Sequence, residues 1–552
     1  MKKHEFPGST NRRTLLLSSG ALLLAANAKG QSSVAAEASD GVPTESPGTF
    51  QVGPVVATTA GKVRGYLAHG IHTFRGLRYG APTSPPNRFQ PPQPPAPWSG
   101  VMSTYVSGGG DRAPQAEQRP ASPTAPGVDP PMSEDCLFLN LFTPGLGDGK
   151  KRPVMVWLHG GGWSSGSGTE PLFDGTRLAT KGDVVIVTVN HRLNIFGYTY
   201  LAPLLGAEYA DSGNNGVLDI IAALRWVKDN IANFGGDSGN VTLFGWSSGG
   251  SEVSQLLAMP LAKGLFHKAI VQSGSQITLR TTEAAARAAD QLLSSLKIPR
   301  ERAREILTLP MATLLTAPSA PGRAAPMVDG GSTPRQPWSP DAPETAAEVS
   351  MLVGGTDSEL ALGARDEVLG MNERTLETKL RSQLGEHTDS LLTAYRKQYP
   401  QATPGQLFIF IGTGLWTTKR VLEQVERKAA QGKASVYCYE WIWRSPVEGG
   451  KFLSHHGVDV PFVWDNLAQG EDRVGLGAGH QALADRWSAR WLAFAHTGSP
   501  NARGLVEWKP YTLARRETLV VNNADQLVSD PFHEVRIALD NLPQSFGEKM
   551  LR

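Results

Sequence analysis

The segment VTLFGWSSGGSEVSQLL, residues 241–257, decides the fold. Its first four residues, Val241–Phe244, form a short apolar run that predicts a buried strand. The apolar residues within 249–257 have the spacing of a helix. Between strand and helix lies Gly-Trp-Ser-Ser-Gly (245–249), which matches G-x-S-x-G, a motif that holds its serine on a strained strand-to-helix turn. The segment therefore predicts a nucleophile elbow with Ser247 at its tip.

The same pentapeptide also occurs at residues 162–166, so the pattern alone does not identify the nucleophile. A strand is predicted before this copy as well, at 154–158. However, the sequence that follows, SGSGTEP (165–171), is unsuited to a helix. We therefore predict a loop at the first copy and assign the nucleophile to Ser247 in the second.

The predicted loop has chemistry of its own, because it begins His159-Gly160-Gly161-Gly162-Trp163. Three successive glycines allow backbone N–H groups to point into one cavity without obstruction by a Cβ atom. This is the pattern of an HGGG-type oxyanion loop, although a flexible glycine turn would have the same residues. We predict that Gly161 and Gly162 donate to an oxyanion, together with the N–H of Ser248, the residue after the nucleophile.

Strands and helices alternate around these motifs. The continuous apolar runs 154–158 and 184–189 are typical of strands covered on both faces. Residues 216–234 have apolar side chains at helical spacing, and 375–395 and 480–496 show the same periodicity. Further strands are predicted at 351–354 and 436–443, and short strand-like runs begin near residue 51. This order predicts an α/β fold with a mostly parallel sheet flanked by helices.

We expect one catalytic domain over residues 51–545, with large helical insertions. The sequence has no internal repeat, and nothing in it marks an independent second domain. Residues 106–133 are rich in Gly and Pro and predict a loop. Seven prolines within 318–345 exclude a long regular element there.

The chain resembles the type B carboxylesterase/lipase family, which also contains the cholinesterases. Matching motifs extend from residue 51 to about residue 540. Besides the glycine loop and the elbow, they are SEDCLFLNL (133–141), NHRLNIFG (190–197), GNNGVLD (213–219), FGGD (234–237) and GLFHKAIVQSG (264–274). The resemblance implies the α/β-hydrolase fold and hydrolysis of carboxylic esters through a Ser-His-Glu triad and an acyl-enzyme.

The resemblance also indicates the other two members of the triad. In this fold the chain order is serine, acid, histidine. The family's acid follows the strand at 351–354, which implies Glu359, with Asp357 as the alternative. The family's base lies in a pattern that reads HGVDVPFV here, which implies His456, with His455 as the nearby alternative. The remaining downstream histidines lack that setting and are expected to be structural: His480, His496 and His533.

Several residues depart from the family pattern. Trp246 stands where the family usually has Glu before the nucleophile, which replaces a carboxylate by a large apolar surface. We predict that Trp246 and Trp163 line a pocket for neutral or aromatic acyl esters rather than for a cationic choline group. The alternative is that Trp246 points into the core. Asp459 stands where Glu is common, and we expect it to support the base from behind.

The composition excludes several classes of protein. Of 552 residues, 19% are charged and 40% hydrophobic, which is typical of a globular protein. The formal charge is +2 with no dense Lys/Arg run, so we expect no nucleic-acid partner. We expect a small-molecule ester as substrate, no cofactor, no metal, and a monomer or homodimer.

Two cysteines, Cys136 and Cys438, exclude a dense disulfide framework and a multi-cysteine metal site. An exported protein could pair them with each other. Many relatives pair the cysteine of the SEDC motif with an upstream cysteine, but none precedes Cys136 here. We therefore expect Cys136 to be a free buried thiol.

The N-terminus predicts export. Four basic residues precede a moderately apolar stretch at 15–26, and Ala26-Asn27-Ala28 fits a signal cleavage site. NRRTLL (11–16) resembles a twin-arginine signal, with an ordinary Sec signal as the alternative. The stretch is too short and polar to span a bilayer. We predict a signal peptide at 1–28, a disordered lead-in at 29–50, and a periplasmic or secreted mature protein whose formal charge is −1.

Two other functions use the same scaffold. A non-catalytic binding protein would lack part of the catalytic set, whereas Ser247, Glu359 and His456 are all present with the glycine loop. A peptidase or amidase would use the same triad. Only the family resemblance favours an esterase over that third possibility.

Overall fold

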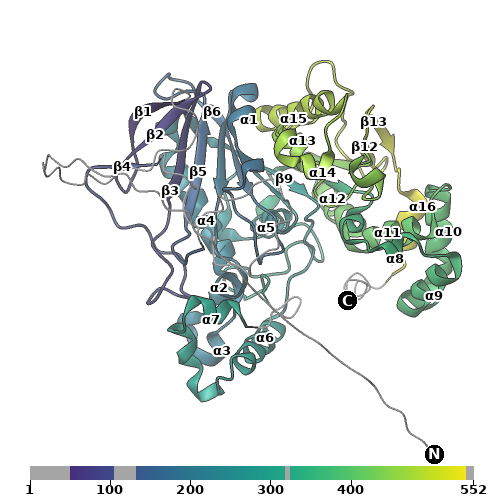
Figure 1. Ribbon diagram of the computed structural model, residues 1–552, viewed down its shortest axis with the longest axis horizontal. Helices are drawn as coiled ribbons and strands as arrows, with labels where there is room; N and C mark the ends of the chain where they lie inside the picture. The colour runs from purple at the N-terminus through teal and green to yellow at the C-terminus, as the bar shows by residue number, and fades with distance from the viewer. Residues whose placement is uncertain (1–49, 105–131, 318–323, 543–552) are drawn as a thin grey trace, which may run out of the picture. The chain divides into compact units, whose positions relative to one another are not determined.

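The computed structural model describes residues 50–104, 132–317 and 324–542, and all of them fall within one compact unit (Figure 1). The predicted signal peptide and all but the last residue of the predicted lead-in lie outside the described residues. The predicted loop at 106–133 also falls almost entirely outside them.

One sheet runs through the described residues, in the order β1-β2-β3-β5-β7-β6-β8-β9-β10-β11-β12-β13, with β4 paired to β2. Its strands are β1 (Phe50–Ala57), β2 (Lys62–Ala68), β3 (Ile71–Arg78), β4 (Val101–Ser103), β5 (Phe138–Thr143), β6 (Arg152–Leu158), β7 (Val185–Val189), β8 (Gly236–Trp246), β9 (Lys268–Gln272), β10 (Ser350–Thr356), β11 (Val436–Trp441), β12 (Glu517–Val521) and β13 (Gln526–Ser529). From β7 to β12 every neighbouring pair is parallel, and the antiparallel pairs lie at the two ends. The predicted mostly parallel sheet is therefore confirmed.

The strand order reverses at β6, which lies between β7 and β8. In open parallel sheets, ligands bind beyond the carboxyl ends of the strands at such a reversal. The register pairs Leu158, the last residue of β6, with Gly245 in β8. The segments that leave these two strands are the glycine loop and the elbow, so the topology places them side by side.

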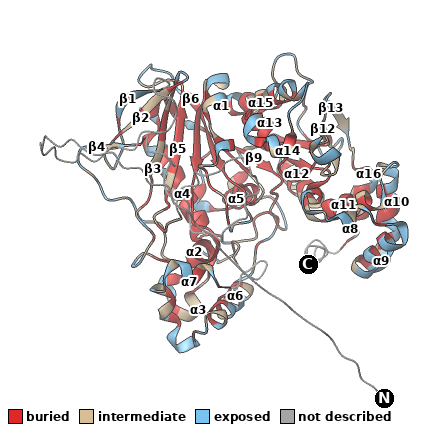
Figure 2. Cartoon of the chain, viewed as in Figure 1, coloured by how far each residue is buried: buried red, intermediate tan, exposed pale blue. Residues whose placement is uncertain are grey.

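Helices cover both faces of the sheet, and alternate residues of β6 contact the helices on opposite faces. Val154, Val156 and Leu158 belong to one buried apolar cluster, whereas Met155 and Trp157 belong to another. The first cluster includes residues of α4 (Asn215–Asn230), α5 (Ser248–Leu256) and α12 (Lys419–Gln431). The second includes residues of α1 (Thr176–Gly182), α13 (Val460–Trp464) and α15 (His480–Thr497). The strands between these helices are buried, as the red ribbons in Figure 2 show.

The remaining helices form insertions with apolar clusters of their own. One cluster joins α3 (Ala202–Leu205), α6 (Thr282–Ser295) and α7 (Met311–Leu315). The other joins α9 (Glu373–Leu384), α10 (Thr388–Gln398), α11 (Pro404–Thr413) and α16 (His533–Asp540). Three short helices are the remaining α-helices of the described residues: α2 (Asn194–Tyr198), α8 (Asp366–Leu369) and α14 (Glu471–Val474).

The helical periodicity at 375–395 corresponds to two helices, because α9 ends at Leu384 and α10 begins at Thr388. Gly385 follows α9 with φ of 57° and ψ of −128°, a conformation that residues with a side chain rarely adopt. The leucines on either side of Gly385 keep a helix-like spacing across the break. The apolar periodicity therefore does not mark the boundary between the two helices.

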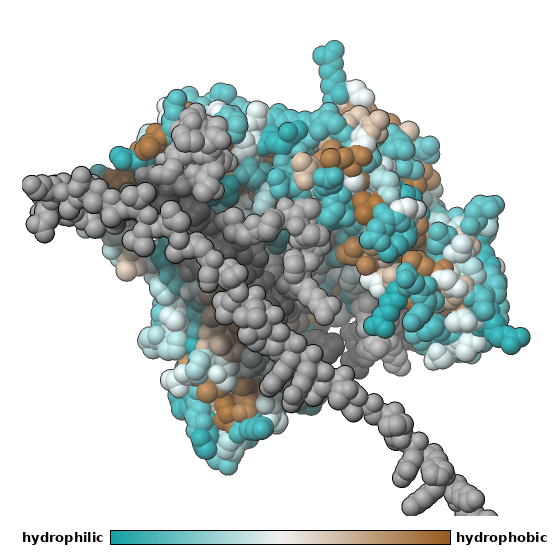
Figure 3. Space-filling view, in the orientation of Figure 1, coloured by the Kyte–Doolittle hydropathy of each residue, from teal (hydrophilic) through white to brown (hydrophobic). Residues whose placement is uncertain are grey.

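Hydrophilic residues cover much of the visible face, with hydrophobic residues in separate patches (Figure 3). No helix in the described parts of the chain is long and apolar enough to cross a membrane. Cys136 and Cys438 are both buried and free, which confirms the expectation for Cys136 and leaves the alternative pairing unformed.

Candidate active site

The predicted strand–turn–helix is present around Ser247. β8 ends at Trp246 and α5 begins at Ser248, so Ser247 alone makes the turn. Its φ of 59° and ψ of −126° are strained for a residue with a side chain. A Cβ at Gly249 would lie 2.1 Å from the carbonyl oxygen of Leu158. Glycine at that position therefore allows α5 to start directly against the end of β6.

The glycine loop follows β6 and contains no helix or strand, as predicted for residues 162–166. Gly161 and Gly162 have φ of 122° and 63°, which glycine adopts without strain. Among the described residues, their backbone N–H groups donate to no acceptor. Ser248 is the first residue of α5, where a backbone N–H has no partner within the helix. Three N–H groups at the predicted positions are thus available to a ligand.

The glycine loop and the elbow lie against each other. A Cβ added at Gly160 would lie 3.1 Å from the Cβ of Ser247 and 2.7 Å from a ring carbon of Trp246. The loop therefore passes directly over the nucleophile candidate, with only glycine's lack of a side chain making room.

Glu359 and His456 meet at the carboxyl end of β10. The Oε2 atom of Glu359 lies 2.5 Å from Nδ1 of His456, and the His456 backbone N–H donates to the Glu359 carbonyl at 3.1 Å. The Glu359 carboxylate is buried, and its Oε1 accepts hydrogen bonds from Ser273 Oγ at 2.6 Å and from the Thr356 N–H at 2.9 Å. A carboxylate at Nδ1 fixes the proton there and leaves Nε2 of His456 unprotonated, as a general base requires.

Trp246 brings the elbow and the base together. Its ring centroid lies 4.9 Å from that of His456. Within the described residues no hydrogen bond joins Ser247 Oγ to the His456 ring. Catalytic hydrogen bonds of this kind are often long without substrate and tighten only in the complex.

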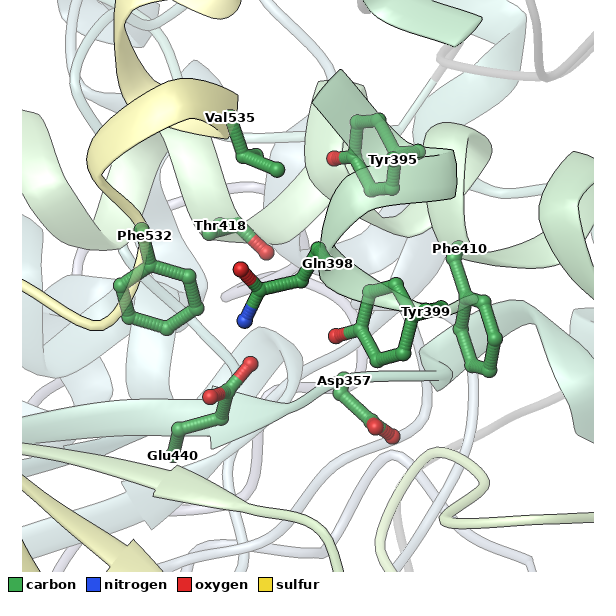
Figure 4. Close-up of a pocket in the computed structure, with 9 residues that line it drawn as sticks. All are labelled: Asp357, Tyr395, Gln398, Tyr399, Phe410, Thr418, Glu440, Phe532 and Val535. Carbon is green, nitrogen blue, oxygen red and sulfur yellow. The ribbon is translucent and has the colours of Figure 1, made fainter. Parts of the chain in front are cut away.

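Asp357, the alternative acid, pairs with an arginine rather than with His456. It forms a two-pronged ion pair with Arg444, whose Nη2 lies 2.6 Å from Oδ2. Figure 4 shows Asp357 at the edge of a small cavity, with Tyr395 on the opposite side and Gln398 between them. Arg444 also donates to Ser358 Oγ and Ser454 Oγ. The Asp357–Arg444 pair therefore connects the segment that contains Glu359 to the segment before His456.

His455, the alternative base, is buried with both ring nitrogens directed at backbone carbonyls. Nδ1 lies 3.1 Å from the His456 carbonyl and Nε2 lies 3.1 Å from that of Arg473. Burial lowers the pKa of His455. It has no free nitrogen for a substrate proton.

The Trp246 ring is only partly buried and lies between Gly160 and Gly457. The guanidinium of Arg473 lies 5.2 Å from the ring centroid, and His456 lies nearby as described above. The indole is thus part of the site rather than fully inside the core. Trp163 is also partly buried, packs against the core cluster that includes β6, and accepts a hydrogen bond from the Asn194 N–H at its carbonyl, at 2.6 Å.

Two further residues contact the triad candidates and were not predicted from the sequence: Ser273 and Trp416. Ser273 directly follows β9 and donates to Glu359, and a search of strand carboxyl ends beside the elbow would have found it. Trp416 lies in a π-helical turn, Gly414–Thr418, with its ring centroid 5.3 Å from that of His456. Such turns recur at functional sites but have no clear sequence signal.

Asp459, three residues after His456, is hydrogen-bonded to the sheet. It is buried and accepts hydrogen bonds from Gln272 Nε2 at 3.0 Å and Tyr439 Oη at 3.1 Å. Burial raises its pKa to about 6. Because Gln272 ends β9 and Tyr439 lies in β11, Asp459 connects the His456 segment to the sheet.

Comparison with known proteins gives a consistent result. The model of the carboxylesterase family matches residues 52–539. Para-nitrobenzyl esterase of Bacillus subtilis (strain 168) is 33% identical over 87% of this chain and 97% of its own length. The rabbit (Oryctolagus cuniculus) cocaine esterase is 31% identical over 84% of this chain and 91% of its own length. The crystal structure of Geobacillus stearothermophilus carboxylesterase EST55 at pH 6.2 superposes with a TM-score of 0.77 and 35% identity, over 88% and 99% of the two chains.

Proposed function

The chain belongs to the carboxylesterase family, with its α/β-hydrolase fold, and is a carboxylic ester hydrolase; we propose that it uses a Ser247-His456-Glu359 triad and acts after export. The observation that carries the proposed triad is the 2.5 Å contact between Glu359 and His456 beside the strained turn at Ser247. The three residues come from the ends of β8 and β10 and from the segment before α13, in the chain order that this fold requires.

The geometry supports a two-step reaction. His456 Nε2 takes the proton of Ser247 Oγ as this oxygen attacks the ester carbonyl. The N–H groups of Gly161, Gly162 and Ser248 stabilise the resulting oxyanion. His456 then returns the proton to the departing alcohol, which leaves an acyl group on Ser247. Water, activated by the same histidine, hydrolyses that acyl-enzyme and restores the serine.

Glu359 keeps His456 in the tautomer that is protonated at Nδ1 during both steps. Its carboxylate holds the Nδ1 proton of His456 and stabilises the imidazolium that forms when Nε2 is protonated. Ser273 and the Thr356 N–H occupy the second carboxylate oxygen, so the carboxylate can turn only if both bonds break.

The proposed substrates are neutral esters, including esters with an aromatic acyl group. Trp246 presents an indole where a carboxylate would attract a cation, and Arg473 adds a positive charge over that indole. The para-nitrobenzyl esterase of Bacillus subtilis, a relative over most of the chain, is named for an ester whose alcohol part is aromatic, which supports aromatic esters but not the acyl side in particular. Trp163 is the second aromatic residue proposed to contact the substrate.

Export is proposed from the N-terminal sequence. The basic leader, the apolar stretch at 15–26 and Ala26-Asn27-Ala28 together have the pattern of a cleaved signal, and Arg12-Arg13 favours the twin-arginine route. That route carries folded proteins, and the mature enzyme would act in the periplasm or outside the cell.

Steady-state kinetics on a panel of p-nitrophenyl and aryl esters test the proposed triad. We expect Ser247→Ala to abolish turnover and Glu359→Gln to lower kcat on the order of 10⁴-fold, because the amide no longer fixes the tautomer of His456. Ser164→Ala, at the same position of the first pentapeptide, is the matched comparison and should keep turnover within a few-fold. Turnover by Ser247→Ala at the wild-type rate would exclude Ser247 as the nucleophile.

A further inference from the structure

Four buried titratable side chains lie behind the glycine loop, and the proposed mechanism uses none of them. They are His159, His191, Tyr198 and Glu252. They come from four separate segments: the residue after β6, the segment after β7, the last residue of α2, and α5 five residues beyond Ser247. Buried ionisable groups are costly unless they are paired, so this cluster requires an explanation.

The four side chains form one continuous chain of contacts. The rings of His159 and His191 stack, with centroids 4.9 Å apart and an interplanar angle of 14°. The Nε2 atom of His191 lies 3.5 Å from Oε2 of Glu252. Tyr198 donates its hydroxyl proton to Oε1 of Glu252 at 2.7 Å. The contacts thus lead from α5 back to the first residue of the glycine loop.

The pair His191–Glu252 needs one proton. His191 Nδ1 faces the Arg192 carbonyl at 3.1 Å, so Nδ1 carries a hydrogen and Nε2 of the neutral ring is an acceptor. An ionised Glu252 Oε2 is also an acceptor, and neither atom has another hydrogen-bond partner in the described parts of the chain. Two buried acceptors facing each other repel, whereas a single proton between them makes a hydrogen bond.

Burial places that proton on the carboxyl group. It raises the pKa of Glu252 to about 8 and lowers the pKa of His191 to about 4. At neutral pH the protonated Oε2 of Glu252 therefore faces Nε2 of His191 at 3.5 Å and carries the hydrogen that this acceptor lacks. Arg192, the residue after His191, forms an ion pair with Asp219 at 2.6 Å, so the two charges cancel and add no net charge beside the cluster. Tyr198 faces the carboxyl as a neutral donor, because burial raises its pKa well above the usual value.

His159 connects this cluster to the peptide that carries an oxyanion donor. Its Nδ1 donates to the Gly160 carbonyl at 2.8 Å. In a trans peptide the C=O and the following N–H point in opposite directions. The direction of the Gly160 carbonyl therefore fixes the direction of the Gly161 N–H. A Cβ at Gly166 would lie 2.5 Å from His159 Nδ1 and 2.3 Å from the Gly160 oxygen, so the loop closes tightly over this hydrogen bond.

We propose that Glu252 is a positioning residue for the oxyanion loop: its protonated carboxyl holds His191, and the stacked His191–His159 pair holds the Gly160 peptide so that the Gly161 N–H faces the oxyanion. The inference rests on the proposed function, because it assigns Gly161 to the oxyanion hole. Since that donor acts mainly in the transition state, Glu252 influences kcat more than KM.

Two substitutions at Glu252 separate hydrogen bonding from packing. Glu252→Gln can still accept from Tyr198, and its amide N–H can donate to His191. Glu252→Met fills a similar volume without donor or strong acceptor. We expect Glu252→Gln to keep kcat within about two-fold at pH 7, and Glu252→Met to lose kcat about ten-fold with KM within about two-fold, part of the loss of ~100-fold or more when such a donor is removed.

The pH profile gives a second readout that packing alone would not change. In the wild type the shared proton leaves as pH rises through about 8, so kcat should fall there. Glu252→Gln has no proton to lose at this position and should retain kcat through that range. A transition-state analogue, such as a trifluoromethyl ketone, should bind Glu252→Met more weakly by the same factor as kcat/KM falls.

A matched variant controls for loss of a buried carboxyl group. Glu440 in β11 is also buried, with a pKa raised by burial, and it lines the cavity in Figure 4, none of whose lining residues belongs to the glycine loop. Glu440→Gln should retain the alkaline fall in kcat, while Glu252→Gln loses it. Thermal unfolding at pH 7 establishes that each variant is folded; if Glu252→Met does not fold, the pH profile of Glu252→Gln decides.

The inference is wrong if Glu252→Met keeps wild-type kcat, if Glu252→Gln is as impaired as Glu252→Met, or if the alkaline fall persists in Glu252→Gln. These outcomes differ from failure of the proposed function. If the proposed function is wrong, a fluorophosphonate does not label Ser247 in the wild type. If only the role of Glu252 is wrong, that labelling is unchanged.

Discussion

Trp246 contacts the proposed base, and this contact changes what the residue is expected to do. Its ring lies between two glycines, Gly160 and Gly457, where any side chain would collide with the indole. His456 has Trp416 as a second aromatic neighbour, so two indoles surround the imidazole. The residue before the nucleophile is therefore in contact with the ring of the base.

Replacing Trp246 by Glu tests its effects on the base and on the choice of substrate. The new carboxylate would stabilise the imidazolium of His456, so the acid limb of the kcat/KM profile should move to higher pH. It should also raise the rate with choline esters relative to neutral esters of similar size. Trp246→Phe is the control, because it keeps an aromatic ring without charge. If Trp246→Glu leaves every substrate ratio unchanged, Trp246 does not contact the substrate.

Substitutions distinguish Asp357 from Glu359, because we expect the first to lower stability and the second to lower kcat. Asp357→Asn removes the charge of a buried carboxylate that pairs with the partly exposed Arg444, and we expect a loss of about 1.5–3 kcal/mol in the free energy of unfolding. The folded variant should keep kcat within about ten-fold, because Asp357 does not touch His456. Chemical denaturation and steady-state rates measure the two effects. A loss of kcat on the order of 10⁴-fold would instead make Asp357 the acid.

At the scale of elements, the junction of β8 and α5 depends on the absence of a side chain at Gly249. Gly249→Ala would place a methyl group 2.1 Å from the Leu158 carbonyl oxygen, so α5 would have to move. We expect a loss of about 1–3 kcal/mol in the free energy of unfolding, with a lower kcat because Ser247 moves too. Gly331→Ala is the matched control: its nearest neighbour would be 3.9 Å away, and stability and kcat should not change. Equal melting temperatures for the two variants would contradict this account.

The sequence predicted elements whose signals are local. The strand before Ser247, the strained turn and the following helix all depend on neighbouring residues, and so does the difference between the two Gly-Trp-Ser-Ser-Gly copies. The break at Gly385 was missed because a leucine periodicity continues across it. The contact of Ser273 with Glu359 joins residues 86 positions apart, and only the order of β9 and β10 in the sheet brings them together.

The contacts within the cluster behind the glycine loop also could not be predicted from the sequence, because they join residues that are far apart in the chain. His191 lies in a motif that the family resemblance identified, and Glu252 lies five residues after Ser247. Neither position indicates that the two side chains face each other, because the contact requires β6, β7 and β8 to be neighbours. The identities of the triad candidates came from the family pattern, and the structure adds their distances.

For the whole molecule, Glu252 makes stability depend on pH. Its pKa is higher in the folded state than the usual value of 4.5, so between these values the folded state holds more protons than the unfolded state. The free energy of unfolding therefore falls as pH rises towards 8, by at most about 1.4 kcal/mol per pH unit for one group. Unfolding in urea at pH 6.5 and pH 8 should show a larger fall for wild type than for Glu252→Gln. Parallel changes in the two proteins would show that Glu252 is ionised throughout.

Export also concerns the whole chain. If the leader uses the twin-arginine route, Arg12→Lys with Arg13→Lys keeps its charge but should retain the enzyme in the cytoplasm of a bacterial host. Esterase activity in periplasmic and cytoplasmic fractions measures this, and the mature N-terminus should begin at Lys29. Equal export of both forms would favour a Sec signal, and no export of the wild type would exclude a signal peptide.

The central claim is that Ser247, and not the serine of the twin pentapeptide, attacks the ester. Mass spectrometric mapping of a fluorophosphonate adduct tests it most directly, because the reagent bonds covalently to an activated serine. We predict a single adduct on Ser247, absent in Ser247→Ala and retained in Ser164→Ala. An adduct on Ser164, or labelling that persists in Ser247→Ala, would contradict the account.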